Sequence, residues 1–462
     1  MARTVLTGFR GTGKTRVGEL LAHMLGIPFF DTDTMVENKA GMTIFEIFQK
    51  YGEEHFRRLE CEVIRSLQYT DSVVSTGGGA VMNPENVASL RKESTVFLLT
   101  ADDRTIEDRI ARTKRPALTR LPLREEIHEL QRLRRPHYLS SADFCIDTSG
   151  RDTNETAMTI RRVLSDGITT EKDRQDFMTF ARSTRINRED ANALERGFAS
   201  EDSDPLTRLY AIAGNPCSHS LSPPLFNHLF STYRINALYT RLCWPDFPEL
   251  AREAKKAGIR GLSVTHPFKQ DALAASDEAD EHATAIGAAN TLLFCEGITY
   301  GFNTDWIGIK TPLSHLRESR AVVLGAGGAA AAAVYALQSL GIEVTIVNRT
   351  PAKAKDLAER FSCRTATPAQ FAETEPDVVV NATPVGMEPD GGIPLNPALL
   401  KKSMTVFDFV YTPAETPLIR AARNAGCAVI PGTEMFVGQA CAQFRQFTGI
   451  EVPVAEVRGF LL

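Results

Sequence analysis

The spacing of apolar residues predicts strands and helices that alternate along most of the chain. In the first third, short apolar runs between helical patterns predict strands at residues 4–6, 28–30, 73–75, 96–99 and 144–146. Beyond the middle, similar runs predict strands at residues 209–213, 321–324, 343–347, 377–380, 406–409 and 429–430. This alternation is typical of α/β folds with parallel sheets, whose ligands bind at the carboxyl ends of the strands.

The chain is too long for a single ordinary core, because it has 462 residues. We expect a first domain at residues 1–165, a charged and partly helical connector at 166–206, and a second module at 207–462. The net charge of −5 gives no reason to expect a nucleic-acid or membrane partner. The sequence shows neither a signal peptide nor a good membrane span, so we expect a cytoplasmic protein. We expect small molecules as its substrates, and the protein could form a homodimer.

The eight cysteines are scattered and form no Cys-x-x-Cys pair. Such a pattern is typical of buried free thiols in a reducing compartment, and it predicts neither a metal site nor a disulfide framework.

A phosphate-binding loop follows the first predicted strand. Residues 8–15 read Gly-Phe-Arg-Gly-Thr-Gly-Lys-Thr and lead into a helical pattern. In such a loop the backbone N–H groups hold phosphates, Lys14 can reach the β- and γ-phosphates, and the Thr15 hydroxyl can ligate Mg²⁺. No Asn-Lys-x-Asp motif follows, which argues against a GTPase, and the domain is too small for a motor ATPase. A small-molecule kinase remains.

More polar groups follow the next strands of this domain. Asp31 and Asp33 come after the second strand, where one carboxylate could order Mg²⁺ and the other could hold an acceptor hydroxyl; a helix cap is the alternative. Gly77, Gly78 and Gly79 follow the third strand, where backbone must approach something closely. Arginines crowd residues 109–135, and prolines divide this stretch into a loop, a helix and a loop. That is the layout of a lid over a transferred phosphoryl group, with a solvated basic face as the alternative.

The first domain as a whole resembles shikimate kinase. The motifs that carry the resemblance are the phosphate loop, Asp31-x-Asp33, Phe56-Arg57-x-x-Glu60, the glycine triplet, Arg115-Pro116 and Arg134-x-Pro136-x-Tyr138. The resemblance implies that shikimate is bound by Asp33, Arg57, Gly77, Gly78, Gly79 and Arg134. It implies that ATP is bound by Gly11, Thr12, Gly13, Lys14, Thr15 and Arg115, and that Mg²⁺ is bound at Thr15 and Asp31. The catalytic residues would be Lys14, Asp33 and Arg115. Arg109 and Arg112 lie where the family stacks an arginine on adenine, but the spacing to Arg115 is one residue short, so that contact stays unassigned.

The second module opens with polar groups at strand ends. Ser220 and Ser222 lie in a strand-to-helix loop and offer two hydroxyls to a polyol or carboxylate, although Ser222 could equally be a simple helix cap. Lys269 follows a strand end, where it could be a general acid or base or merely a solvated charge. Asn290 and Asp305 each end a short strand, and a carboxylate near Lys269 would orient it.

A dinucleotide fingerprint, Gly325-Ala326-Gly327-Gly328-Ala329-Ala330, comes after the strand at 321–324. The next strand ends in Asn348-Arg349-Thr350, where an NAD enzyme usually carries an acidic residue. An arginine without a carboxylate favours the 2′-phosphate of NADP, and a bland surface arginine is the alternative.

This module resembles shikimate dehydrogenase over its whole length. The motifs are Ser220-x-Ser222-Pro223, Val264-Thr265-x-Pro267-x-Lys269, Gly287-Ala288-x-Asn290-Thr291, Asn303-Thr304-Asp305, the fingerprint, Asn348-Arg349-Thr350 and Gly438-Gln439-Ala440. One departure is Ser263, where the family often has Asn. The resemblance implies a two-lobed fold, with a substrate-binding lobe at residues 207–310 plus 435–462 and a Rossmann NADP-binding lobe at 311–434.

By the same resemblance, Lys269 and Asp305 form the catalytic pair. The substrate would be bound by Ser220, Ser222, Thr265, Asn290, Asp305, Tyr411 and Gln439. The nucleotide would be bound by Glu281, Gly325, Ala326, Gly327, Gly328, Ala329, Asn348, Arg349, Thr350, Phe409 and Gly432.

Together the two resemblances predict a bifunctional α/β enzyme of the shikimate pathway with ATP, Mg²⁺ and NADP(H) as cofactors. The C-terminal module would reduce 3-dehydroshikimate to shikimate, and the N-terminal module would phosphorylate shikimate at its 3-hydroxyl. One alternative is a sensor or scaffold that kept the fold and lost the chemistry. Another is a second module that acts on quinate with NAD.

Overall fold

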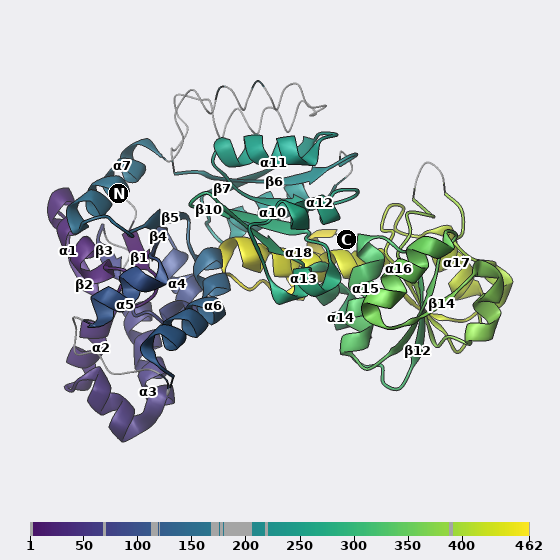
Figure 1. Cartoon of the computed structure of the whole chain (residues 1–462), viewed down its shortest axis with the longest axis horizontal. Coiled ribbons are helices and arrows are strands. Elements are labelled where there is room, and N and C mark those ends of the chain that lie inside the picture. The colour runs from purple at the N-terminus through teal and green to yellow at the C-terminus, as the bar shows by residue number, and fades with distance from the viewer. Residues whose placement is uncertain are drawn as a thin grey trace. The chain divides into compact units, whose positions relative to one another are not determined.

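The chain forms two compact units in the computed structural model, and Figure 1 shows their elements coloured along the sequence. The structure describes residues 3–67, 71–111, 119, 121–167, 175, 179, 206–217, 220–387 and 391–461. The first unit comprises Met1–Leu262, Leu293–Ile298 and Phe444–Glu451. The second unit comprises Ser263–Leu292, Thr299–Gln443 and Val452–Leu462.

The first sheet confirms the five strands predicted for the first domain. The strands are β1 (Arg3–Thr7), β2 (Phe29–Asp31), β3 (Val73–Ser75), β4 (Ser94–Thr100) and β5 (Phe144–Asp147). They pair in parallel in the order β2-β3-β1-β4-β5. All five residues of β1 are buried, as expected for a central strand covered on both faces.

Helices cover both faces of this sheet. They are α1 (Lys14–Leu25), α2 (Thr32–Ala40), α3 (Ile44–Ser66), α4 (Pro84–Arg91), α5 (Asp103–Ala111), α6 (Leu123–Ser141) and α7 (Thr153–Asp166), with a short 3₁₀ turn, η1 (Ala80–Met82). Leu6 and Phe97 pack against α1 and α7, while Val5 and Val96 pack against α3 and α4. Successive strand residues point to opposite faces, so one apolar run serves both layers.

Pro136 does not end a helix, which corrects the predicted loop at this point. Helix α6 runs through Pro136 to Ser141. Proline removes one backbone hydrogen bond from a helix interior. The last turn of α6, after Pro136, is stabilised by packing instead, because Tyr138, Leu139 and Ser141 are buried. Arg134 therefore projects from a regular helix.

The second sheet has six strands in the order β7-β6-β8-β10-β11-β9. These are β6 (Arg208–Gly214), β7 (Ala237–Cys243), β8 (Ile259–Val264), β9 (Glu278–Ala279), β10 (Thr291–Cys295) and β11 (Ile298–Phe302). The accompanying helices are α10 (Ser222–Thr232), α11 (Phe247–Lys256), α12 (Lys269–Ala274) and α13 (Glu281–Ile286). In the first unit, Tyr210 contacts Phe230 and Phe447, and Phe226 stacks on Tyr239, so aromatic rings build much of the local core.

The third sheet is wholly parallel, in the order β14-β13-β12-β15-β16-β17. Its strands are β12 (Arg320–Leu324), β13 (Glu343–Val347), β14 (Arg364–Ala366), β15 (Val378–Asn381), β16 (Thr405–Asp408) and β17 (Ala428–Ile430). The remaining elements are α14 (Asp305–Leu313), α15 (Gly328–Ser339), α16 (Pro351–Phe361), α17 (Pro417–Asn424), α18 (Gly432–Thr448), α19 (Val454–Leu461), η2 (Pro368–Thr374) and η3 (Pro397–Leu399).

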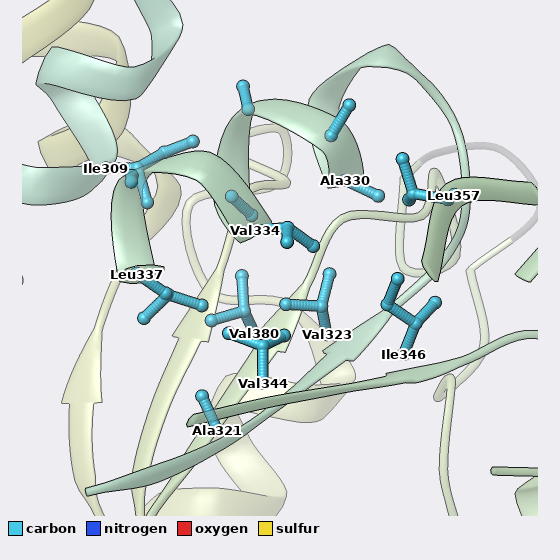
Figure 2. Packing of buried hydrophobic residues seen from close by; sticks show 14 of the residues in the cluster. Ile309, Ala321, Val323, Ala330, Val334, Leu337, Val344, Ile346, Leu357 and Val380 are labelled. Atoms are coloured by element: carbon cyan, nitrogen blue, oxygen red, sulfur yellow. The ribbon is translucent and has the colours of Figure 1, made fainter. Parts of the chain in front are cut away.

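The alanine-rich helix α15 lies against the third sheet, as Figure 2 shows. Ala330, Val334 and Leu337 face Val323 and Val380 in one buried cluster. Small side chains let the helix pack closely on the strands, which fixes the position of its N-terminus. Strand β12, the glycine turn and α15 thus form a buried β-turn-α unit. In the described part of the chain, no helix is both long and apolar enough to span a bilayer.

Two disulfides correct the prediction that the cysteines are free thiols. Cys217 pairs with Cys243, and Cys145 pairs with Cys295 across a sequence separation of 150 residues. The first pair joins the segment after β6 to the end of its neighbour β7. Cysteines on neighbouring strands can be close in space while far apart in the sequence. The absence of Cys-x-x-Cys pairs therefore could not exclude these disulfides. Free thiols are found at Cys61, Cys363, Cys427 and Cys441.

A glycine crossing between α14 and α18 gives a test of the fold. A Cβ at Gly308 would lie 2.4 Å from the Met435 carbonyl oxygen, which leaves no space for alanine. We expect Gly308→Ala to lower stability by about 1–3 kcal/mol through overpacking. Gly459→Ala is the matched control, because it lies in helix α19 with nothing within 4 Å, and alanine there should not destabilise. Urea unfolding followed by circular dichroism measures both, and equal midpoints for the two variants would contradict the crossing.

Candidate functional site

The phosphate loop has the predicted conformation between β1 and α1. Gly11 and Gly13 have φ values of 87° and 94°, in the left-handed region that glycine adopts easily. Helix α1 begins at Lys14, whose Nζ donates to the carbonyl oxygens of Gly8 at 2.8 Å and Phe9 at 2.9 Å. The loop thus presents a helix N-terminus and a lysine at the same end of the sheet, which suits an anionic ligand.

Thr15 and Asp31, the two residues predicted to bind Mg²⁺, are hydrogen-bonded to each other. The Thr15 hydroxyl donates to Asp31 Oδ2 at 2.9 Å. Asp31 Oδ1 also caps α2 by accepting from the backbone N–H groups of Asp33 and Thr34, which confirms the helix-cap alternative. The role of Asp31 at Mg²⁺ stays a prediction. The described residues contain no cluster of three or more His, Cys, Asp or Glu side chains that could hold a metal. In phosphate-transfer sites Mg²⁺ usually binds substrate phosphates and waters beside one or two protein ligands.

The glycine triplet faces the side chains predicted to bind shikimate. A Cβ at Gly77 would lie 2.6 Å from Asp33 Oδ1, and one at Gly79 would lie 2.7 Å from the Arg57 guanidinium. Arg134 Nη1 donates to the Gly78 carbonyl oxygen at 3.2 Å. Glycine is needed here because these polar groups come within contact of the backbone. Asp33, Arg57 and Arg134 thus meet around one loop.

Carboxylates hold Arg57 in place. Its Nη1 donates to Glu60 at 2.9 Å, and its Nε and Nη2 both contact Glu53. Burial raises the pKa of Glu60, and the charge of Arg57 partly offsets that rise. A guanidinium anchored in this way can still present an edge to a carboxylate of the substrate.

The other predicted arginines of residues 109–135 differ in whether the structure places them at the site. Arg109 donates to the Gly11 carbonyl oxygen at 3.2 Å and to Thr148, so it supports the phosphate loop directly. The predicted lid residue Arg115, together with Arg112, lies outside the described residues. Sequence reasoning missed the buried pair of Arg10 and Glu126, which joins the phosphate loop to α6.

In the second unit, Lys269 and Asp305 form the predicted pair. Lys269 Nζ contacts Asp305 Oδ2 at 2.6 Å, and the two side chains are 18 % and 4 % exposed. Each residue begins a short helix at a strand end. Asn290 Nδ2 donates to the other oxygen, Asp305 Oδ1, at 2.8 Å. The carboxylate is therefore fixed on both sides while the lysine keeps an exposed edge.

Gln443 supports Asn290, and sequence reasoning did not find it. Its Nε2 donates to the Asn290 carbonyl oxygen and to the Thr291 hydroxyl, each at 3.0 Å. Its Oε1 accepts from the Ser263 hydroxyl at 2.8 Å. Ser263, the departure from the family pattern, thus has a structural partner. A lone glutamine in an amphipathic helix carries no sequence signal for this role.

The remaining predicted substrate residues lie in both units. In the first unit, the Ser220 hydroxyl accepts from the Ser222 backbone at 3.2 Å, and Ser222 is the first residue of α10 without capping it through its side chain. In the second unit, Thr265 follows β8 and Gln439 lies within α18. Tyr411 packs against Phe436, and burial raises its pKa.

The dinucleotide fingerprint forms the turn between β12 and α15. Gly325 has φ 113°, and a Cβ there would lie 3.2 Å from the Ala382 carbonyl oxygen. Gly328 opens the helix, and its Cβ position lies 3.5 Å from the Cβ of Lys269. The turn therefore adjoins the Lys269 and Asp305 pair. Ala326, Gly327 and Ala329 complete this helix N-terminus, which suits a pyrophosphate.

The end of β13 carries the predicted specificity residues. Asn348 Nδ2 donates to the Thr350 carbonyl oxygen at 3.0 Å and shapes the turn that holds Arg349 exposed. Lys353, in the first turn of α16, adds a second cation that the motif search overlooked. These groups suit an added phosphate better than a free ribose hydroxyl.

The other predicted nucleotide residues occupy the same unit. Glu281 begins α13 with an exposed side chain. Gly432 begins α18, and a Cβ there would lie 2.7 Å from the Phe409 carbonyl oxygen. Asp408, directly before Phe409 in the sequence, is fully buried and accepts from Asn381 and Thr416 at the carboxyl ends of β15 and β16. Burial raises the pKa of Asp408, and these hydrogen bonds lower it in part.

Family models match both parts of the chain. Residues 10–165 match shikimate kinase. Residues 212–292 match the shikimate dehydrogenase substrate binding domain, residues 309–385 match shikimate / quinate 5-dehydrogenase, and residues 432–459 match the shikimate 5′-dehydrogenase C-terminal domain.

Individual relatives agree with these matches. Shikimate dehydrogenase (NADP(+)) of Maridesulfovibrio salexigens is 40% identical over 266 residues, which cover 55% of this chain and 96% of that protein. The structure of shikimate dehydrogenase from Aquifex aeolicus is 34% identical, with a TM-score of 0.53, and covers 55% of this chain and 97% of its own. The structure of the enzyme from Thermus thermophilus, in complex with NADP(H) and shikimate, is 35% identical, with a TM-score of 0.51. The match covers 55% of this chain and 98% of that one.

Gln443 gives a test of how the site is supported. Gln443→Leu would leave buried polar groups of Asn290, Thr291 and Ser263 without a partner. We expect a loss of about 1–3 kcal/mol in the free energy of unfolding, measured by urea titration. Gln446→Leu, one turn further along α18 and only partly buried, is the control. A Gln443→Leu protein as stable as the control would show that these hydrogen bonds do not hold the site.

Proposed function

Because the chain belongs to the shikimate dehydrogenase family and carries a shikimate kinase module ahead of it, we propose that it catalyses two successive steps. The second module reduces 3-dehydroshikimate to shikimate with NADPH, and the first phosphorylates the 3-hydroxyl of shikimate with MgATP. The observation that supports the proposal is that the structure brings together two groups of side chains predicted to act on these substrates. These are the Lys269–Asp305 pair and the triad of Asp33, Arg57 and Arg134 around the glycine loop.

In the reduction, NADPH supplies a hydride to the carbonyl carbon when it is bound. The oxygen of that carbonyl gains negative charge and needs a proton. Lys269 has an ammonium with an exposed edge, and Asp305 fixes its direction. The pair therefore delivers the proton to the developing alkoxide. The nucleotide turn adjoins Lys269 at Gly328, which supports transfer at this point.

In the phosphorylation, the chain binds shikimate by its carboxylate and by the hydroxyl that reacts. Arg57 and Arg134 carry the charge and the planar donors that a carboxylate requires. Asp33 is the carboxylate that orients the 3-hydroxyl for attack on the γ-phosphorus of ATP. Lys14 stabilises the charge on the transferred phosphoryl group. We assign the same stabilising role to Arg115, by its resemblance to the kinase motif.

The alternatives lack comparable support. A sensor or scaffold that had lost its chemistry would carry a change at Lys14, Asp33, Lys269 or Asp305, and all four are in place. Quinate differs from shikimate in its ring and not in the carboxylate that the site addresses. Rates with quinate and NAD, measured beside those with shikimate and NADP, decide between these substrates.

The two lysines test whether each activity belongs to its own module. We expect Lys269→Ala to lower the dehydrogenase kcat by about 10²–10⁴-fold, because a general acid is lost, while the kinase kcat stays unchanged. Lys14→Ala should do the reverse. Both activities are measured on the same preparations, with circular dichroism as a check of folding. If either substitution in a folded protein abolished both activities, the assignment of the activities to separate modules would be wrong.

Arg349 tests the preference for NADPH. Arg349→Gln removes the cation that we place at the 2′-phosphate, so kcat/KM for NADPH should fall about 10-fold or more while that for NADH changes little. Arg364→Gln on the neighbouring strand is the control, since Arg364 is exposed and pairs with Glu343. An equal loss with both nucleotides, or none with either, would refute this role for Arg349.

A further inference from the structure

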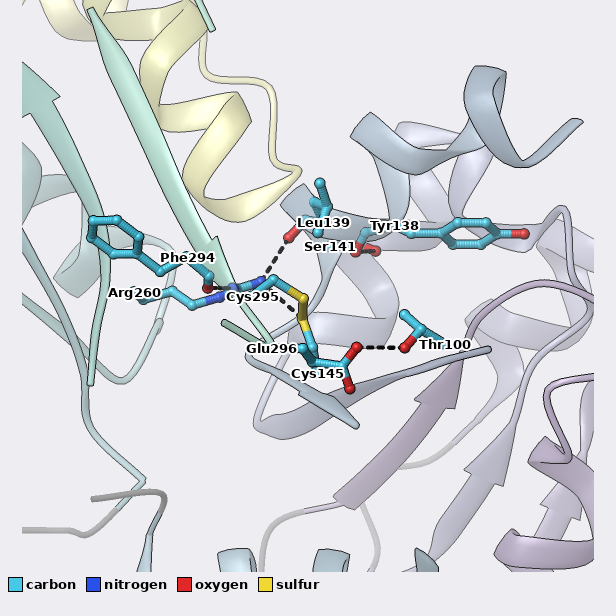
Figure 3. Close-up of a disulfide and its surroundings, with 9 residues drawn as sticks. All are labelled: Thr100, Tyr138, Leu139, Ser141, Cys145, Arg260, Phe294, Cys295 and Glu296. Carbon is cyan, nitrogen blue, oxygen red and sulfur yellow. Dashed lines mark hydrogen bonds between the residues drawn. A yellow bond between two sulfur atoms is a disulfide. The ribbon is translucent and has the colours of Figure 1, made fainter. Parts of the chain in front are cut away.

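The kinase module and part of the dehydrogenase module lie in the same compact unit. We call their junction the seam, defined by Thr100, Asp143 and Cys145 on the kinase side and by Arg208, Cys295 and Glu296 on the other. Figure 3 shows the centre of the seam, where β5 of the kinase meets the end of β10. The kinase module and this part of the dehydrogenase module are therefore joined by direct contacts as well as by the connecting segment of the chain.

A buried ionic cluster lies within the seam. Asp143 is 2 % exposed and accepts from Arg91 of its own module at 2.8 Å and from Arg208 of β6. Its second oxygen accepts from the Val96 backbone at 2.8 Å. A buried charge that loses its partner is costly, so Asp143 and Arg208 favour the docked arrangement.

A covalent bond and a bridging arginine add to this cluster. Cys145 and Cys295 are disulfide-bonded, with their Cα atoms 5.8 Å apart. Arg260 donates to the carbonyl oxygen of Phe294 on its own side and to that of Leu139 on the kinase side, as Figure 3 shows. A loop of this length closed by a disulfide strongly restricts the unfolded chain, and the bond ties β5 to β10.

From the seam, hydrogen bonds lead to the phosphate loop. The Thr100 hydroxyl at the end of β4 donates to Glu296 Oε2 at 2.5 Å. The Thr100 carbonyl oxygen accepts from the Thr148 backbone and hydroxyl, both at 2.9 Å. Arg109 donates to Thr148 and to the Gly11 carbonyl oxygen. Glu296 is thus linked through Thr100, Thr148 and Arg109 to the loop that binds ATP.

We propose that the dehydrogenase module is a structural part of the kinase nucleotide site. Cys295 holds β5 through Cys145, and Glu296 holds the end of β4 through Thr100; from there Thr148 and Arg109 lead to the phosphate loop, which this contact positions. Glu296 is a positioning residue, since it acts through Thr100. The inference rests on the kinase activity proposed above and concerns how that activity is supported.

Glu296 also makes the support dependent on pH. Burial raises the pKa of Glu296 to about 7, with the hydrogen bond from Thr100 opposing the rise. Asp147 raises the pKa further, and Arg151 and Arg260 lower it. An acid whose folded pKa is raised above its unfolded value is held neutral at low pH, and its ionisation as the pH rises works against the folded seam. ATP binding should therefore weaken as the pH rises from about 6 to 8.

The test measures the Kd of a non-hydrolysable ATP analogue by calorimetry on full-length protein, with kinase and dehydrogenase kinetics beside it. Glu296→Ala should raise the Kd and the KM for ATP at least threefold, while the KM for shikimate and the dehydrogenase kcat stay unchanged. Glu296→Gln keeps an acceptor for Thr100, so it should bind like the natural protein at pH 6 and lose the pH dependence. An unchanged Kd in Glu296→Ala, or a pH dependence that survives in Glu296→Gln, overturns the proposal.

The disulfides provide a matched pair of variants. Cys145→Ser should weaken binding of the analogue at least threefold, while Cys217→Ser, which breaks the disulfide beside β6 and β7, should leave it unchanged. Peptide mapping without reductant identifies the bonds in each protein. If Cys145→Ser does not fold, adding dithiothreitol to the folded Cys217→Ser protein tests the Cys145–Cys295 bond instead. Equal effects of the two substitutions contradict the seam, whereas analogue binding without turnover in the natural protein contradicts only the kinase activity.

Discussion

Both sites depend on backbone that lies closer to its neighbours than a side chain would permit. At Gly77 and Gly79 the space that a Cβ would fill is occupied by Asp33 and Arg57. At Gly325 the chain turns against the Ala382 carbonyl, so that α15 begins beside Lys269. The glycines bring functional side chains and backbone donors to one edge of each sheet. Parallel strands supply that edge, because all their carboxyl ends point the same way.

Buried polar groups hold the chemistry in place once the backbone has set its position. Asn290 donates to Asp305, Gln443 donates to the Asn290 carbonyl oxygen, and Lys269, the proposed general acid, contacts the carboxylate that is held in this way. Asp143 plays a comparable part in the first unit, where it joins arginines from two modules. Each of these groups would be costly if left alone, which makes the arrangement specific.

Much of this organisation could be predicted from the sequence, for a physical reason. Strands and the glycine turns are local features, and Asp33 and Lys269 follow strand ends closely in the sequence. Arg57 lies within α3, and only its family motif indicated its role. Gln443 could not be found in this way, because its partners are more than 150 residues distant. The disulfide between Cys145 and Cys295 could not be predicted for the same reason, because 150 residues separate the two cysteines. The continuation of α6 through Pro136 could not be predicted either, because proline favours a helix end locally and the packing of the turn that follows is not visible in the sequence.

The central claim is that one chain makes shikimate and then phosphorylates it. The most direct measurement supplies the purified protein with 3-dehydroshikimate, NADPH and MgATP and follows both NADPH absorbance and shikimate 3-phosphate by mass spectrometry. The account predicts that phosphorylated product appears, that its formation requires NADPH, and that omission of ATP leaves shikimate as the end product. Consumption of NADPH with no phosphorylated product, even when shikimate itself is added, would contradict the account.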